Sequence, residues 1–249
     1  MIGKEIELYK FQVSILLCHK SSNNRTIIIF LICTILISIC NAQSERKEVF
    51  NEILQSYSEV SLPIQDFLSL NTENTIDAKL LNRLLFDLQD GKAKHYVKDT
   101  LYRITSYGRI SEEPFNYTDS KKEGDEWIDF EVSFPINIHA LGKIEFIDDH
   151  VGLITRVVGF MTDYIDIFLF EKSTGTLKSM VAAFEAKHEY HGHPEEGYEA
   201  VYNTSTITED RRINWHQERY GVTSDRIFDV SPDGYFRVIF QKQEGEFEY

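Results

Sequence analysis

The sequence predicts a mainly β protein, with antiparallel sheets and two N-terminal helices. Apolar residues recur at helical spacing only within residues 44–90, whereas from Leu101 onward they mostly alternate with polar ones, as on a strand. The strand-like segments follow one another through turns, without the intervening helices that a parallel sheet needs. A sandwich, a partly open barrel and a propeller-like packing all satisfy this pattern.

The first predicted helix covers residues 44–60. Its apolar residues recur every three or four positions, which gives one buried stripe, and Pro63 ends it. The stripe consists of Val49, Phe50, Ile53, Leu54, Tyr57 and Val60. We expect this stripe to belong to the core of the domain.

The second predicted helix covers residues 75–90. Asn74 is its expected cap, Asp77 lies in its first turn and Gly91 stops it. A stripe of five leucines forms its buried face, namely Leu80, Leu81, Leu84, Leu85 and Leu88. Together the two helices predict a helical part that precedes the strands.

The clearest predicted strand covers residues 127–134. Ile128, Phe130, Val132 and Phe134 point to one face, and polar residues alternate with them, so we expect a half-buried strand.

About nine or ten short strands are predicted in total. The later ones lie at residues 143–149, 151–160, 163–172, 176–186, 197–208, 213–222, 225–230 and 235–242. The segment 163–172 is apolar on both faces near its end, as in a central strand. Turns with the sequences DDH, STG and SPDG connect several of them. In the last strand we expect Phe236, Val238 and Phe240 to face inward.

The N-terminal region resembles a secretory signal. Arg25 precedes an apolar run over residues 27–40, and Ala42 closes a small-residue site, so residues 1–42 are the expected leader and 43–249 the mature domain. The run of fourteen residues is shorter than the roughly twenty of a membrane-spanning helix, so no span is expected after cleavage. A lipoprotein attached at Cys40 and an uncleaved anchor or buried segment are the alternatives.

Composition limits the classes of function. The chain carries a formal charge of -14, and removing residues 1–42, with four basic and two acidic side chains, leaves about -16. Such an acidic surface repels nucleic acid and anionic membranes. The three cysteines are Cys18, Cys33 and Cys40, so the expected mature domain has no disulfide, thiol nucleophile or thiolate ligand.

Several short sequence motifs in the mature part resemble those of a group of bacterial proteins. They are VSLP at residues 60–63, LGKI at 141–144, LI at 153–154 and a Gly turn at 174–175. In this order they resemble small exported proteins of Bacteroidota. The resemblance implies a secreted or cell-envelope protein, and no activity comes with it.

The densest group of metal-ligand types is KHEYHGHPEE. It contains His188, His191 and His193 beside three glutamates, and imidazole with carboxylate suits zinc or another transition metal. The spacing does not match the His-Glu-x-x-His of a zinc protease. We interpret the segment as a solvated loop, with a weak metal site as the second interpretation and a catalytic one as the third.

The two tryptophans are candidate ligand contacts. Trp127 and Trp215 lie in strand patterns among polar neighbours, where an outward indole stacks on a sugar ring or anchors a protein contact. Covering a sheet edge or packing under a loop is the structural alternative, which we favour for both.

The sequence therefore predicts an exported, noncatalytic binding or structural domain with a protein or carbohydrate partner. It contains neither a G-x-S-x-G elbow nor a Gly-rich phosphate loop, and it points to no catalytic residue and no required cofactor. The alternative is an extracytoplasmic metal-assisted hydrolase built on His191 and His193, with Glu189, Glu195 or Glu196 as ligand or base.

Overall fold

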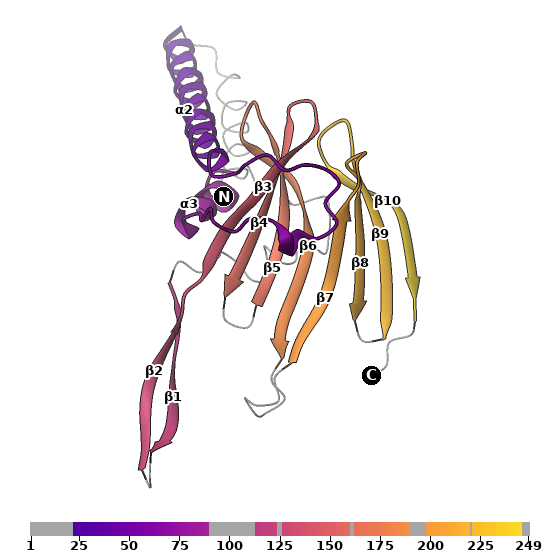
Figure 1. Cartoon of the computed structure of the whole chain (residues 1–249). Coiled ribbons are helices and arrows are strands. Elements are labelled where there is room, and N and C mark those ends of the chain that lie inside the picture. Colours follow the sequence, from indigo (N-terminus) through magenta and orange to yellow (C-terminus); the bar gives the residue numbers. More distant parts are fainter. Residues whose placement is uncertain are drawn as a thin grey trace.

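A single curled antiparallel sheet dominates the computed structural model of the protein. The structure describes residues 22–89, 113–123, 126–159, 162–189, 198–219 and 221–245. Eight strands form the sheet in the order β3 to β10, so that neighbours in sequence are neighbours in space (Figure 1). They are β3 (Asn137–Ile147), β4 (His150–Gly159), β5 (Thr162–Glu171), β6 (Thr176–Glu189), β7 (Tyr198–Ile207), β8 (Ile213–Arg219), β9 (Val222–Val230) and β10 (Phe236–Glu244).

The sheet is open, because β3 and β10 form its two edges. It is also curled. The backbone N–H of Phe236 at the start of β10 donates to Ser179 Oγ of β6 at 2.9 Å, and the rings of Phe236 and Phe146 meet edge to face at 5.4 Å. The prediction of a mainly β, antiparallel protein is confirmed, and among the described strands no barrel is closed.

The helix α2 (Ser22–Leu54) is longer at its start and shorter at its end than the sequence predicts. The chain has neither proline nor glycine between Arg25 and Leu54, so nothing stops the helix at the expected boundary after Ala42. Its end at Leu54 instead of Val60 follows from pairing with the sheet, since Val60 N–H donates to the Lys143 carbonyl of β3. Within the described residues no helix has both the length and the hydropathy of a membrane span.

The second helical region consists of α3 (Ala78–Asn82), followed by one π-helical turn, η2 (Arg83–Asp87). Asp77 caps it, because its carboxylate accepts the backbone N–H groups of Lys79 at 2.7 Å and Leu80 at 3.1 Å. The expectation that Asn74 is the cap is wrong. The backbone carbonyl of Asn74 instead accepts the N–H of Ala140 in β3.

Residues 58–70, here called the strap, run from the β3 side across the face of the sheet opposite to α2 (Figure 1). The strap begins beside Lys143 of β3, and Ile64 exchanges two backbone hydrogen bonds of 2.8 Å with Ile207 of β7. It then forms the short 3-10 helix η1 (Phe67–Ser69), capped by Asp66. The strap therefore ties the β3 side of the sheet to β7.

The core has two parts, one on each face of the sheet. On the helix face, Phe50 of α2 packs on Phe170 of β5 with ring centroids 5.2 Å apart. On the strap face, Ile64 and Phe67 join a cluster that includes Ile167 of β5. Strand β5 is buried on both faces, which confirms the prediction for residues 163–172.

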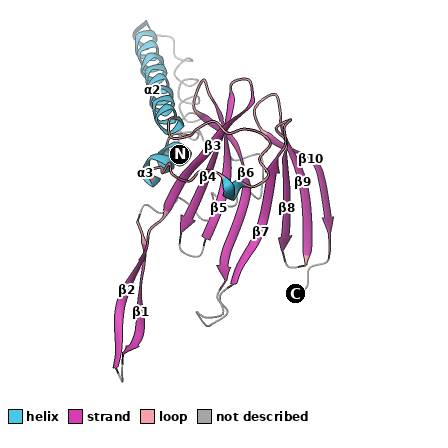
Figure 2. Cartoon of the chain, in the orientation of Figure 1, coloured by secondary structure: helices cyan, strands magenta, loops and turns pink. Residues whose placement is uncertain are grey.

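The strands β1 (Phe115–Glu123) and β2 (Glu126–Phe134) form a separate two-stranded hairpin. Figure 2 shows it projecting from the body of the protein beyond the β3 side of the sheet. Nine residue pairs follow without a bulge from Phe115–Phe134 to Glu123–Glu126. The expectation of a half-buried strand at residues 127–134 holds only near the base, where Val132 and Phe134 are half-buried, because no second layer covers the rest.

The last strand also differs from expectation. Phe236 is buried, but Val238 and Phe240 are exposed. A bulge lies between these two residues, so Val238 pairs with Phe228 and Phe240 pairs with Ile227. Because Phe228 and Ile227 are consecutive in β9, Val238 and Phe240 point to opposite faces of the sheet. The prediction that all three aromatic or apolar residues face inward is therefore wrong.

Candidate functional site

The histidine-rich segment lies mostly outside the described residues. The backbone of His188 belongs to β6 and pairs with Glu199 of β7, but its side chain and all of residues 190–197, including His191 and His193, fall outside the described part. Among the residues that the structure does describe, no group of three or more His, Cys, Asp or Glu side chains is placed to hold a metal ion. The metal interpretation remains a prediction.

The two tryptophans have different positions. The backbone of Trp127 lies in β2 opposite Lys122, and its side chain is outside the described part. Trp215 is only 9% exposed and belongs to the core cluster on the strap face. The guanidinium of Arg226 lies 4.9 Å from the centroid of its ring. These contacts match the structural alternative for Trp215.

Trp215 also completes a backbone hydrogen bond that the sheet leaves open. Strands β6 and β7 pair only between Glu185–Glu189 and Tyr198–Asn203, and nearer the strap they separate. There the carbonyl of Ala182 accepts Nε1–H of Trp215 and Nδ2–H of Asn203, each at 2.9 Å. A buried carbonyl without a partner is costly, so these two side chains stabilise the point where the strands diverge.

A buried polar contact lies on the helix face. The hydroxyls of Tyr57 and Thr155 are 2.5 Å apart, and Thr155 of β4 stands opposite the buried Asp166 of β5. Burial raises the pKa of Tyr57, so the phenol stays neutral in the folded protein. This contact lies inside the core between α2 and the sheet, where it holds the end of the helical part in place.

Exposed large apolar side chains gather on three surfaces of the described chain. One is the N-terminal half of α2, one is the hairpin and one is β10; Leu68 of η1 stands apart from them. The members are Ile32, Leu36, Ile37 and Ile39 in α2, Phe115, Ile128 and Phe130 in the hairpin, and Val238, Ile239 and Phe240 in β10. Contiguous exposed apolar groups commonly mark interaction sites, so these surfaces are the candidate functional sites.

One face of the hairpin carries a row of apolar residues along β2, and on that face Lys121 of β1 stands opposite Ile128. Its register places Phe115 opposite Phe134, and Ile128, Phe130 and Val132 alternate along β2 on the same face. The exposed members of this apolar face are 39–45% exposed. The other face is polar, with a hydrogen bond of 2.5 Å between Ser120 and Asp129 among its contacts.

Strand β10 is an edge with an apolar centre and charged ends. Val238, Ile239 and Phe240 are 42–48% exposed. Arg237 precedes them and forms an ion pair of 3.6 Å with Asp229, and Lys242 follows them and contacts Glu244 at 2.7 Å. The hydrogen bond with Glu244 raises the pKa of Lys242, so the lysine is charged at neutral pH.

The sequence signal for the hairpin was present but incomplete. Strict alternation predicts the strand at residues 127–134, and the charged, glycine-containing KKEGDE before it is the kind of segment that forms a hairpin turn. Alternation alone does not say whether another layer covers the apolar face. In β10 a bulge changes the face to which Phe240 points, and no residue pattern in the sequence indicates that bulge.

The fold and these surfaces define an antiparallel β protein with a helical layer on one face and exposed apolar strands at both ends. Comparison of the chain with protein-family models, with curated proteins and with solved structures finds no match.

Proposed function

We propose that this protein is an exported, noncatalytic binding domain that holds a partner protein through the apolar face of the β1–β2 hairpin. The observation that carries the proposal is the exposure of Phe115, Ile128 and Phe130 on a hairpin that projects from the body. An isolated two-stranded hairpin is only marginally stable in water. A partner that covers the apolar face would stabilise it.

Charge favours a protein partner over a membrane. The tip of the hairpin carries Lys121, Lys122, Glu123 and Glu126, which would have to lose their hydration to enter a bilayer. Residues 115–134 contain six acidic and two basic side chains, so an anionic lipid surface repels the hairpin. A sugar partner has less support, since Trp215, one of the two tryptophans considered as a sugar contact, is buried.

The proposal of export rests on α2. Leu36 and Ile37 in the apolar run are exposed, whereas Val49, Phe50 and Ile53 further along the same helix are buried against the sheet. The core of the domain thus depends on the part of α2 that follows the proposed cleavage site at Ala42. An export signal that is removed before function fits this division of the helix.

A photoreactive amino acid placed in the hairpin tests the binding role. We expect a probe at Phe130, on the apolar face, to give discrete cross-linked products in cells that export the protein. A probe at Asn116, on the polar face of the same hairpin, is the matched control and should give none. Equal cross-linking at both positions, or none at Phe130, would contradict the proposal.

A further inference from the structure

We propose that the partner of the hairpin is the β10 edge of a second copy of this chain, so that copies associate head to tail. This inference rests on the proposed binding role of the hairpin. In this contact the apolar face of the hairpin of one copy packs against the exposed apolar residues of β10 of the next copy.

Both surfaces include an exposed strand edge. Strand β10 pairs only with β9, and in the described chain no strand lies beside its outer edge; β1 and β2 likewise pair only with each other. The strands are nine residues long in all three cases. A strand edge presents backbone donors and acceptors that pair readily with another chain.

The opposite edge of the sheet is less open. Residues of the helical part make bridges to β3 at two places, where Glu59 pairs with Lys143 and Thr75 pairs with His139. These contacts cover the outer side of β3. Strand β10 is therefore the sheet edge that is available to a second copy.

Charge favours the hairpin-to-β10 contact over a contact between two hairpins. The hairpin, residues 115–134, has six acidic and two basic side chains, whereas at the β10 edge Arg237 and Lys242 balance their ion-pair partners Asp229 and Glu244. Two hairpins would repel each other. The ion pairs that Arg237 and Lys242 now make are on the surface, so exchanging them for carboxylates of the hairpin costs little.

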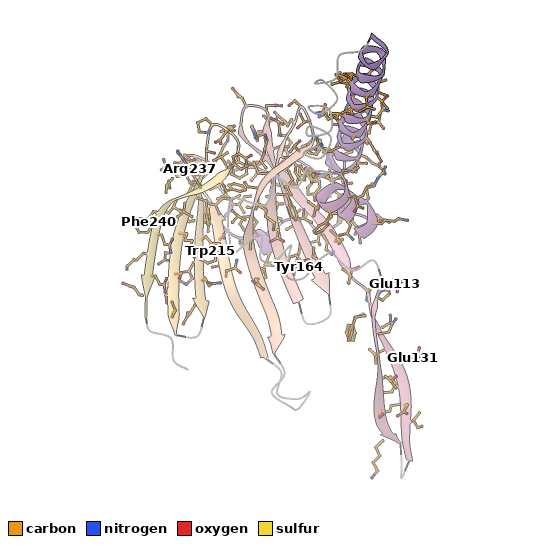
Figure 3. All side chains as sticks on the ribbon, turned by 180° about the vertical axis from the view of Figure 1, so that it is seen from behind. Glu113, Glu131, Tyr164, Trp215, Arg237 and Phe240 are labelled. Atoms are coloured by element: carbon orange, nitrogen blue, oxygen red, sulfur yellow. The ribbon has the colours of Figure 1, made fainter. Side chains whose placement is uncertain are left out.

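The two surfaces cannot meet within one copy. Figure 3 shows Glu131 of the hairpin and Phe240 of β10 on opposite sides of the molecule, and Figure 1 shows the same separation from the other side. Each copy therefore presents one hairpin and one β10 edge. Such a heterologous contact gives a ring if it closes and an open chain if it does not.

Two variants of the full chain test this inference by sedimentation velocity. Phe130→Glu places a charge on the apolar face of the hairpin, and Phe240→Glu places one on β10. We expect the wild type to form species that grow with concentration and weaken with added salt. Each variant alone should associate at least about tenfold more weakly, because a carboxylate must be buried in the contact.

Mixing the two variants gives the decisive measurement. Each retains one intact surface, so the mixture should form a one-to-one dimer and nothing larger. Ser133→Glu, on the polar face of the hairpin, is the matched control and should associate like the wild type. Far-UV spectra and melting temperatures establish that each variant folds, and Ile128→Lys or Ile239→Lys replaces a variant that does not.

Several outcomes would overturn the inference. One is a wild type that stays monomeric at about 100 μM, because copies that assemble through this contact should associate below that concentration. The others are association of Phe240→Glu equal to that of the wild type, and association that persists in both variants. If copies do not associate but a probe at Phe130 cross-links to a different protein, the proposed binding role stands and only the identity of the partner is wrong.

Discussion

Single side chains decide how the helical part joins the sheet, and Tyr57 is the clearest case. Its hydroxyl contacts Thr155 in the core, and both residues are almost fully buried. We expect Tyr57→Phe to lower the free energy of unfolding by about 1–2 kcal/mol, because Thr155 loses its partner. The double variant that also carries Thr155→Val should lose less unfolding free energy than the two single variants lose in sum. Additive costs in urea denaturation would contradict the contact.

Tyr57 also makes a prediction about pH. Burial raises the pKa of its phenol in the folded state, so the neutral form is favoured there. The stabilising effect is complete below the pKa of the unfolded chain, near pH 10, and is lost as pH rises above it. The stability difference between wild type and Tyr57→Phe should therefore shrink above about pH 10. A difference that stays constant or grows there would show that burial does not raise the pKa of the phenol.

Trp215 tests the distinction between a core residue and a ligand contact. We expect Trp215→Phe to lower the free energy of unfolding by about 1–3 kcal/mol, because the Ala182 carbonyl loses a donor and the ring loses volume. Asn214→Ala, an exposed neighbour on the same strand, should change it by less than about 0.5 kcal/mol. Unchanged stability together with lost sugar binding would restore the role of a ligand contact.

At the scale of elements, the hairpin is separable from the fold. Among the side chains of β1 and β2 that the structure describes, none belongs to either core cluster, and Phe115 and Phe134 at the base stand directly opposite each other. We expect replacement of residues 115–134 by a short Gly–Ser turn to leave cooperative unfolding intact and to shift the melting temperature by only a few degrees. Calorimetry would measure this, and a broad, noncooperative transition would show that the hairpin supports the sheet.

At the scale of the whole molecule, the proposal of export predicts where the mature chain begins. We expect the secreted form to start at or near Gln43, because residues from Val49 onward are needed in the core, whereas Ile32, Leu36, Ile37 and Ile39 of the apolar run before Ala42 are exposed. N-terminal sequencing and an intact mass would test this. A leader that is still attached, or a lipid-modified start at Cys40, would contradict plain secretion.

The sequence by itself determined the antiparallel β class, the position of most strands and the turns at residues 148–149, 173–175 and 231–234. These features depend on alternation and on turn residues, which act within a few positions along the chain. The double-sided burial of β5 was predicted in the same way, because a strand that is apolar on both faces has to lie between two layers.

Only the tertiary structure decided which apolar faces are covered. Residues 127–134 and 163–172 both have apolar strand patterns, yet Phe130 is exposed on a projecting hairpin and Phe170 is buried under α2. The same holds for Trp215, whose polar neighbours in sequence gave no sign of its place in the core. Alternation fixes the side of the strand to which a residue points, but burial depends on which distant segment packs there, and that is a nonlocal property of the fold.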